Sequence, residues 1–451
     1  MQLSPTALRT NRFASSGNRG ILADTLNVSG LIMFSKVAGA AKAVVIAAVF
    51  GSSTELDAYL IAFLIPSFLA DVFCASLVPA LVPAMTGASS HDISTINRLH
   101  ARMQRICLRY SIAGGLLLAM IAAIVTQMPT ASPHIRLIGY MVAILSPMLP
   151  LAAVANLWRA LLHSQRRFVV PTATAVMIPL VIISTVLVMG DTHGIWVLAW
   201  ATTTALLAEV VILAGAVRRT GFELLPKLDR NFALSGITPQ YRHLVAAAAA
   251  SMGGMLVGQS LAATLGGGQV SILNYGTRLT ALLVSVGPAA LAVTILPRFS
   301  SLAAGASERG LNRSLRQMLV LAGLASSGLA LVLILFSPQI VHLTLEHGAF
   351  TAEDTAAVST VQRVSLIQLP FAAGATLLVR ALAALETTQS LVSVTAVALL
   401  GNAILAYALV VPYGVVGITI AATVSQAVLC AALAWVVYRA VGRRLPLENY
   451  S

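Results

Sequence analysis

The chain has 451 residues, of which 58% are hydrophobic and 10% are charged, whereas soluble globular domains are about 45–50% apolar and about 25% charged. This composition excludes an ordinary water-soluble domain. The net charge of +13 does not indicate a nucleic-acid partner, because the basic residues lie in short loops between apolar stretches. The composition is therefore that of a protein that spans a membrane.

The first 27 residues are polar and carry Arg9, Arg12 and Arg19. They contain no apolar stretch of the kind found in a signal peptide, so we expect a cytoplasmic tail over residues 1–27. Apolar stretches of about 20 residues then recur, each long enough to cross the roughly 30 Å hydrocarbon layer as a helix. The long runs of Ala, Leu, Val and Ile exclude a transmembrane β-barrel, whose strands are short and alternating. The twelve predicted spans are residues 28–50, 56–85, 107–127, 136–156, 168–190, 194–216, 243–264, 271–296, 315–336, 362–385, 390–411 and 415–437.

The distribution of Lys and Arg orients these spans. With a cytoplasmic N-terminus, twenty-two of the 28 basic residues fall in inside segments, and only Arg136 and Arg363 fall in outside loops. This bias satisfies the positive-inside rule. It predicts a multi-pass protein of the bacterial inner membrane with both termini in the cytoplasm, the C-terminal tail being residues 439–451.

A weak internal repeat accompanies this pattern. At a shift of 221 positions, Thr174-Ala175-Val176 falls on Thr395-Ala396-Val397, and Ala201-Thr202 falls on Ala422-Thr423. Since six spans separate equivalent positions, both halves would have the same orientation and be related by a pseudo-two-fold axis along the membrane normal. The sequence therefore predicts an all-α polytopic protein of about twelve transmembrane helices in two six-helix lobes. The predicted lobes are residues 28–220 and 221–438.

Ionisable groups inside a bilayer cost about 2.5–3.5 kcal/mol each on insertion scales, so they tend to face a wet cavity or a partner. The candidate cargo-binding residues are Lys36 and Lys42 on the first span, Asp57 and Asp71 on the second, and Asn274 and Arg278 on the eighth. Alternatively, Lys36, Lys42 or Asp57 extends its polar end to the membrane surface from near a helix end. We expect Arg380 to do the same, because it lies near the end of its span. Basic residues inside the membrane favour an anionic cargo and disfavour a cationic drug.

Nothing in the sequence resembles an enzyme site. The eight histidines are scattered, and the chain has no GxxxxGK[ST] motif with which to bind and hydrolyse ATP. Cys74, Cys107 and Cys430 form no CxxC pair, so we expect neither disulfides nor a metal site. We therefore predict no catalytic residues, no metal and no cofactor.

Four segments carry a resemblance to a known family. They are Met33–Gly39, Leu56–Phe63, Asn274–Leu279 and, most specifically, Glu346–Thr355. Together they resemble the MurJ/MviN family of lipid II flippases over roughly residues 28–437. This resemblance implies the two-lobed fold of the multidrug/oligosaccharidyl-lipid/polysaccharide exporter superfamily. It also implies that the protein moves an undecaprenyl-pyrophosphate-linked peptidoglycan precursor from the cytoplasmic to the outer leaflet.

The resemblance also implies roles for individual residues. Lys36, Lys42 and Arg278 would match the family's cavity cations, and Asp57 would match its acidic residue at the start of the second span. Asp71 stands where the family pattern has basic residues. Our hypothesis is a flippase that moves a polyprenyl-pyrophosphate-linked glycan by alternating access, with lipid II as the first candidate. Its partners would be that glycan and the membrane lipids. The alternatives are a flippase for an exopolysaccharide or O-antigen-type lipid-linked unit, and a non-transporting scaffold that binds cell-envelope synthesis proteins.

Overall fold

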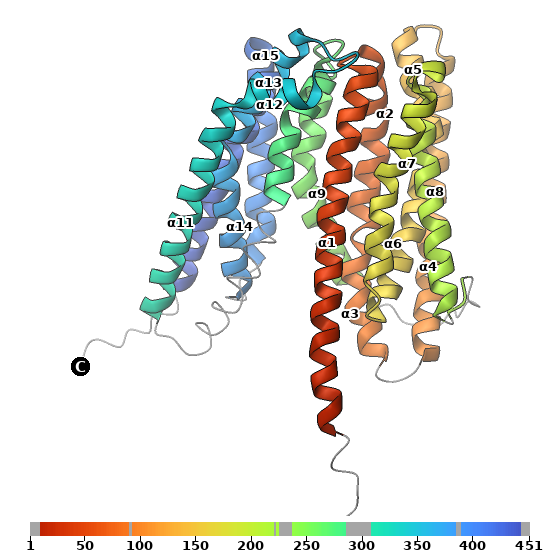
Figure 1. Cartoon of the computed structure of the whole chain (residues 1–451), viewed down its shortest axis with the longest axis vertical. Coiled ribbons are helices and arrows are strands. Elements are labelled where there is room, and N and C mark those ends of the chain that lie inside the picture. The colour runs from red at the N-terminus through yellow and green to blue at the C-terminus, as the bar shows by residue number, and fades with distance from the viewer. Residues whose placement is uncertain are drawn as a thin grey trace, which may run out of the picture. The chain divides into compact units, whose positions relative to one another are not determined.

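The structure is a computed structural model, and it describes residues 10–89, 93–220, 222–224, 237–285, 308–384 and 389–442. These residues form helices and short turns, without a β-strand among them. The helices, shown in Figure 1, are α1 (Thr10–Phe50), α2 (Thr54–Leu69), the π-helical turn η2 (Ala70–Cys74), α3 (Leu77–Ser89), α4 (Ile93–Gln127), α5 (Pro133–Leu145), α6 (Met148–Ser164), α7 (Val169–His193), α8 (Trp196–Arg219), α9 (Ile237–Ala262), α11 (Glu308–Leu335), α12 (Ser337–Leu345), α13 (Ala352–Leu366), α14 (Leu369–Ala384) and α15 (Gln389–Gly442). Residues 269–285 form one further helix between α9 and α11.

Helices occupy every predicted span as far as the structure describes it. In the described part of the chain, ten helical segments are long and apolar enough to cross a membrane. The last of them, within α15, holds two predicted spans, because Gly414 has non-helical angles (φ 56°, ψ −136°) and divides α15 in two. The eighth predicted span begins in the helix at residues 269–285, and its residues 286–296 lie outside the described residues. The predicted all-α polytopic membrane fold is thus confirmed.

Helix α1 begins earlier than its predicted span. Residues 10–27 of the expected N-terminal tail are helical and continuous with the membrane-spanning part of α1. The apolar span itself starts at Asn27, which agrees with the predicted boundary between tail and span.

The chain forms two compact units. The first comprises Met1–Ile46, Leu69–Pro129 and Gly139–Arg242, and the second comprises Ala47–Phe68, Thr130–Ile138 and His243–Ser451. The predicted lobe boundary near residue 220 remains a prediction.

In the first unit, α3, α4, α6 and α8 surround one apolar core, and α7 packs along α8 (Figure 1). The largest fully buried side chains of this core are those of Leu81, Met85, Ile96, Leu157, Leu161, Leu162 and Leu213. Lipid tails are as apolar as these side chains, so close van der Waals packing holds such helices together in a bilayer.

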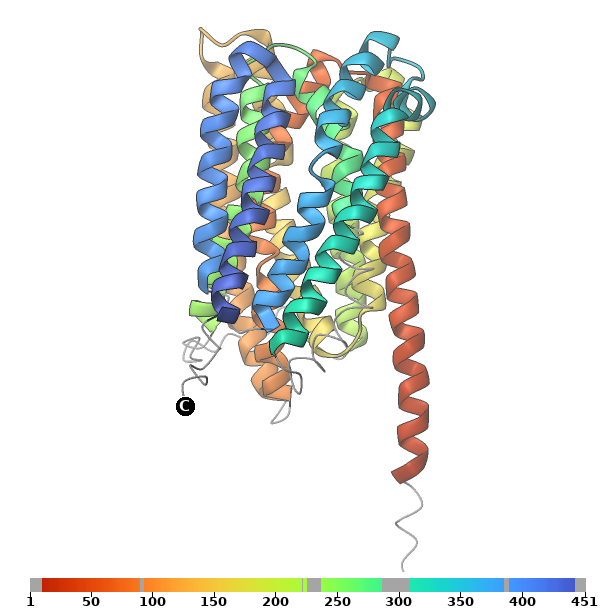
Figure 2. The ribbon, with the colours of Figure 1, turned by 90° about the vertical axis from the view of Figure 1, so that its left-hand side faces the viewer.

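In the second unit, α14 lies between α11 and α15 (Figure 2). Their contact is a cluster of buried apolar residues, including Leu315 on α11, Leu378 and Leu382 on α14, and Leu433 on α15. Close packing of apolar side chains therefore holds these helices together as well.

Local geometry repeats between the two halves of the sequence. Gly194 (φ 59°, ψ −148°) ends α7 with nearly the same backbone angles as Gly414, which lies 220 positions later. The Thr203 hydroxyl donates to the Ile144 carbonyl (3.0 Å), and 220 positions later the Thr423 hydroxyl donates to the Val364 carbonyl (3.2 Å). These matches support the internal repeat. In the last span of each half the shift is 220, one less than the 221 expected from the sequence.

Candidate functional site

The predicted site residues fall in different units, so each group is described by itself. Lys36, Lys42 and Asp71 belong to the first unit, whereas Asp57, Asn274 and Arg278 belong to the second.

The span of α1 carries both lysines and has few buried residues. Lys36 is exposed and Lys42 is half-buried. The apolar residues around Lys36 are exposed as well, from 48% for Ile32 to 57% for Val37. One polar contact fixes this part of α1 inside the unit, since the Ser35 hydroxyl donates to the Ala175 carbonyl of α7 (3.3 Å). Lys36 is therefore available to a ligand, on a helix that a hydrogen bond helps to orient.

Asp71 lies on an irregular turn of the second span. Pro66 removes one backbone donor from α2, and the π-helical turn Ala70–Cys74 follows, closed by a bond from the Ala75 N–H to the Ala70 carbonyl (3.0 Å). Asp71 is exposed, and it makes no hydrogen bond or ion pair with any residue that the structure describes. Single π-turns inside helices are frequent at functional sites. Asp71 is thus a free carboxylate in an apolar span.

Asp57 binds the start of a helix in the second unit. Its side chain is 2% exposed, and its carboxylate accepts hydrogen bonds from the Val270 N–H (3.2 Å), the Ser271 N–H (2.7 Å) and the Ser271 hydroxyl. These backbone groups open the helix at residues 269–285, where the first N–H groups have no partner within the helix. Asp57 therefore caps the helix that carries Arg278. A contact between Asp57 and the cargo remains a prediction.

Arg278 and Asn274 lie one helical turn apart on this capped helix, so they share one face. Arg278 is exposed and Asn274 is half-buried. Tyr275 beside them is buried, with its ring edge-on to Phe350 and its hydroxyl 3.4 Å from the Gly51 carbonyl, to which it donates. The helix that presents Arg278 is therefore held both at its start and along its length.

The segment Glu346–Thr355 packs on the turn that joins α1 to α2. The Ala349 N–H donates to the Ala48 carbonyl (2.8 Å), and the Ser52 hydroxyl donates to the Asp354 carboxylate. Thr351 and Asp354 form a capping box at the start of α13. The structure thus gives this family-like motif a docking role inside the second unit.

Glu346 at the start of this segment is held as a carboxylate. The Thr355 hydroxyl donates to Glu346 Oε2 (2.6 Å), and His342 Nδ1 lies 2.9 Å from the same oxygen. Both hydrogen bonds lower the pKa of Glu346, the bond from Thr355 contributing most.

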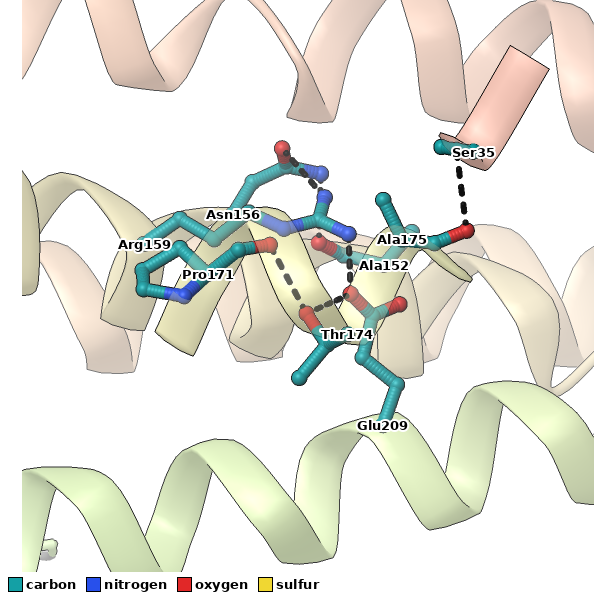
Figure 3. A network of polar contacts seen from close by, with 8 residues as sticks. All are labelled: Ser35, Ala152, Asn156, Arg159, Pro171, Thr174, Ala175 and Glu209. Carbon is teal, nitrogen blue, oxygen red and sulfur yellow. Dashed lines mark hydrogen bonds and ion pairs between the residues drawn. The ribbon is translucent and has the colours of Figure 1, made fainter. Parts of the chain in front are cut away.

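A buried ion pair in the first unit was not predicted from the sequence. Arg159 of α6 pairs with Glu209 of α8, whose side chain is 1% exposed (Figure 3). The Thr174 hydroxyl of α7 donates to the same carboxylate oxygen (3.0 Å), and Arg159 also donates to the Asn156 side chain (3.2 Å). Counting Arg159 among the cations of a cytoplasmic loop was wrong, because it lies inside α6 and has an acidic partner. The lone Glu209 in the apolar stretch 194–216 was the signal that could have indicated such a partner.

The described residues include no group of three or more His, Cys, Asp or Glu that could hold a metal ion. The three cysteines are free thiols. The site residues therefore offer two exposed cations and one half-buried cation, an exposed carboxylate, a half-buried amide and the buried carboxylate of Asp57.

Comparisons with known proteins point to one family. The family profile described as Lipid II flippase MurJ matches residues 46–448. A probable lipid II flippase MurJ from Synechocystis sp. is 25% identical over 429 residues, which cover 88% of this chain and 78% of that protein. A lipid II flippase MurJ from Burkholderia cenocepacia is 22% identical over 354 residues, which cover 74% of this chain and 67% of that protein.

Solved structures share the fold. A lipid II flippase MurJ in an inward closed conformation is similar with a TM-score of 0.79 at 19% identity, covering 92% of this chain and 89% of that one. An inward-facing multidrug resistance MATE family transporter of the MOP superfamily is similar with a TM-score of 0.71 at 13% identity, covering 93% and 99%. These similarities confirm the superfamily fold that the sequence resemblance implied.

Proposed function

The chain belongs to the lipid II flippase MurJ family, and from this membership we propose that it moves a polyprenyl-pyrophosphate-linked glycan, first of all lipid II, from the inner to the outer leaflet. The family match over residues 46–448 is the observation that carries the proposal. Membership also confirms that the chain is a multi-pass membrane transporter and not an enzyme.

The exposed cations suit such a cargo. A pyrophosphate is anionic and must be neutralised before it crosses the hydrocarbon layer. Arg278 would hold two phosphate oxygens with its planar guanidinium, whereas Lys36 and Lys42 would act as point charges. The protein would alternate between conformations that differ in their affinity for the cargo, since a ligand shifts only such an equilibrium. The energy would come from an ion gradient or from the cargo's own disequilibrium.

Complementation tests the proposal. In cells depleted of their own lipid II flippase, expression of this chain is expected to restore growth. The matched control carries Lys36→Met, Lys42→Met and Arg278→Ala and is expected to accumulate in the membrane without restoring growth. If the wild-type chain accumulates but fails, lipid II is not its cargo. If the control restores growth, the cations are not cargo ligands and a scaffold role is favoured.

Asp71 favours one second candidate, a flippase for an exopolysaccharide or O-antigen-type lipid-linked unit. This exposed carboxylate stands on the π-helical turn, where it would repel an acidic glycan and accept hydrogen bonds from a neutral one. Deletion in the native host would then remove a surface polysaccharide while lipid II continued to reach the outer leaflet. Normal surface polysaccharide after deletion would exclude this candidate.

A further inference from the structure

The hydrogen bond between Ser35 and α7 fills a place that a proline leaves open. In a regular helix the Ala175 carbonyl would accept from the N–H four residues later, but that residue is Pro179, which has none. A buried carbonyl without a partner is costly, particularly in a bilayer. The Ser35 hydroxyl supplies the missing donor at 3.3 Å. Pro179 therefore leaves one carbonyl of α7 free to bind α1, and this docking point sets the position of α1 along α7.

A polar network holds the part of α7 next to Ala175. Thr174, the residue before Ala175, bonds to Glu209 of α8, and Glu209 pairs with Arg159 of α6, as Figure 3 shows. Arg159 is held in turn by Asn156 on its own helix. Residues of α6, α7 and α8 thus meet at Glu209. The α7 residue among them, Thr174, directly precedes Ala175, whose carbonyl accepts the hydrogen bond from α1.

Apolar packing does little to set the rotation of α1 here. Met33 and Phe34 are 51% and 53% exposed, and among their near neighbours only Ala38 is buried. Successive residues of a helix are separated by about 100° around its axis. Fixing Ser35 against α7 therefore also fixes the direction in which Lys36 leaves the helix.

We propose that Ser35 and the Arg159–Glu209 pair are positioning residues for Lys36, holding its ammonium group in the direction that meets the anionic part of the cargo. This inference rests on the proposed function. It assigns an indirect role in transport to Ser35 and to the ion pair. The direction of the Lys36 side chain would depend on the hydrogen bond made by the neighbouring Ser35.

The test measures binding of undecaprenyl pyrophosphate, and of lipid II, to the purified full chain in detergent. Loss of one hydrogen bond typically changes an equilibrium about two- to tenfold, so Ser35→Ala is expected to raise Kd by about this factor. Its thermal midpoint is expected to fall, because the Ala175 carbonyl loses its donor, so Kd is measured well below that midpoint. The matched control is Ser184→Ala, which removes an exposed hydroxyl of α7 that bonds only within its own helix, to the Val181 carbonyl. This control is expected to leave Kd unchanged.

A double-mutant cycle separates positioning from general structure. If Ser35 acts through Lys36, Ser35→Ala has no further effect on Kd once Lys36→Met is present. A full effect of Ser35→Ala in the Lys36→Met background, or no effect in the wild type, overturns the inference. A wild-type chain that binds neither probe overturns the proposed function as well, so the two failures are distinguishable.

The ion pair is tested by replacing both of its members with apolar residues, Arg159→Met with Glu209→Leu. Such a replacement of a buried pair is often neutral or stabilising, so the double variant is expected to fold. By the inference it raises Kd as Ser35→Ala does, because Thr174 loses its partner on α8. A folded double variant with the Kd of the wild type would overturn the positioning role of the pair.

Discussion

Arg159 and Arg380 show that the pairing and exposure of an arginine depend on a single partner residue. They lie 221 positions apart, at equivalent places of the two halves, but at the shift of 220 found in the last span Glu209 of the first half corresponds to Leu429 in the second. Arg159 is therefore paired inside its unit, whereas Arg380 is exposed and makes no hydrogen bond or ion pair with the residues that the structure describes. Charge counting placed Arg159 among the cytoplasmic cations and Arg380 inside an apolar span, near its end. The acidic partner accounts for the partial burial of Arg159.

Glu209→Gln is expected to destabilise the first unit. It leaves the Arg159 guanidinium without a counter-charge, and breaking a buried ion pair from one side costs about 3–5 kcal/mol. The lower end is expected, because the Arg159 side chain is 21% exposed and water can reach it. Thermal unfolding in detergent measures the effect. Thr204→Ala is the control, since Thr204 is an exposed residue of α8 that bonds only within its helix, and a Glu209→Gln midpoint equal to that of Thr204→Ala would contradict the prediction.

Arg278→Lys is expected to weaken cargo binding, and Arg278→Ala to weaken it further. A guanidinium holds two phosphate oxygens in a planar fork, whereas an ammonium provides a point charge. Losing a charge-assisted hydrogen bond costs about 1.5–3 kcal/mol, or on the order of ten- to a hundredfold in affinity. Both variants are expected to accumulate normally, because Arg278→Lys keeps the charge of the wild type and Arg278→Ala relieves an insertion penalty.

Arg380→Ala is the control for Arg278, because it also removes one exposed arginine from a span and is expected to leave binding within about twofold of the wild type. Wild-type flipping by Arg278→Ala would show that Arg278 is not a cargo ligand.

At the scale of helices, kinks and hydroxyl side chains occur together. A kink leaves a backbone carbonyl without its helical donor, and a hydroxyl from a neighbouring helix fills the gap. Ser35 does this for Ala175 four residues before Pro179, and Tyr241 does it for Phe73 on the π-helical turn. In the two repeats, Thr203 and Thr423 donate to carbonyls in the last turns of α5 and α13, where Val364 also accepts from the Ile367 N–H. Prolines can be read from the sequence. Which hydroxyl donates to the carbonyl that a proline leaves unpaired depends on which helices become neighbours.

Gly348 is required by the close approach of its loop to α1. Its φ is +62°, and a Cβ at this position would lie 2.2 Å from the Ala48 carbonyl oxygen. Gly348→Ala is therefore expected to cost more than the roughly 1–3 kcal/mol of a residue held in an unfavourable backbone region. Gly194→Ala is the matched control, because Gly194 has a φ of +59° with nothing within 4 Å of the added Cβ. Equal thermal midpoints for the two variants would mean that the contact with Ala48 does not constrain the loop.

At the scale of the whole molecule, apolar length and the position of Lys and Arg were enough to predict the all-helical membrane fold. Twenty apolar residues can satisfy their backbone in a bilayer only as a helix, so the spans follow from composition. The site was less predictable. Exposure of Lys36, Asp71 and Arg278 agrees with ligand-facing residues, but the capping role of Asp57 and the pairing of Glu209 depend on contacts between residues more than 40 positions apart. Sequence periodicity carries no information on such contacts.

Topology is the prediction on which the arrangement of the whole chain depends. Without Arg159, the bias of twenty-one basic residues to two predicts that both termini lie in the cytoplasm, and the even number of predicted spans requires the termini to share a side. A green fluorescent protein fused after Ser451 is therefore expected to fluoresce, because it folds in the cytoplasm. Alkaline phosphatase fused after Glu346 is expected to be active, because that loop would lie outside, and the reverse fusions are expected to be silent. Phosphatase activity after Ser451 would make the number of spans odd, and the two halves could then no longer share one orientation.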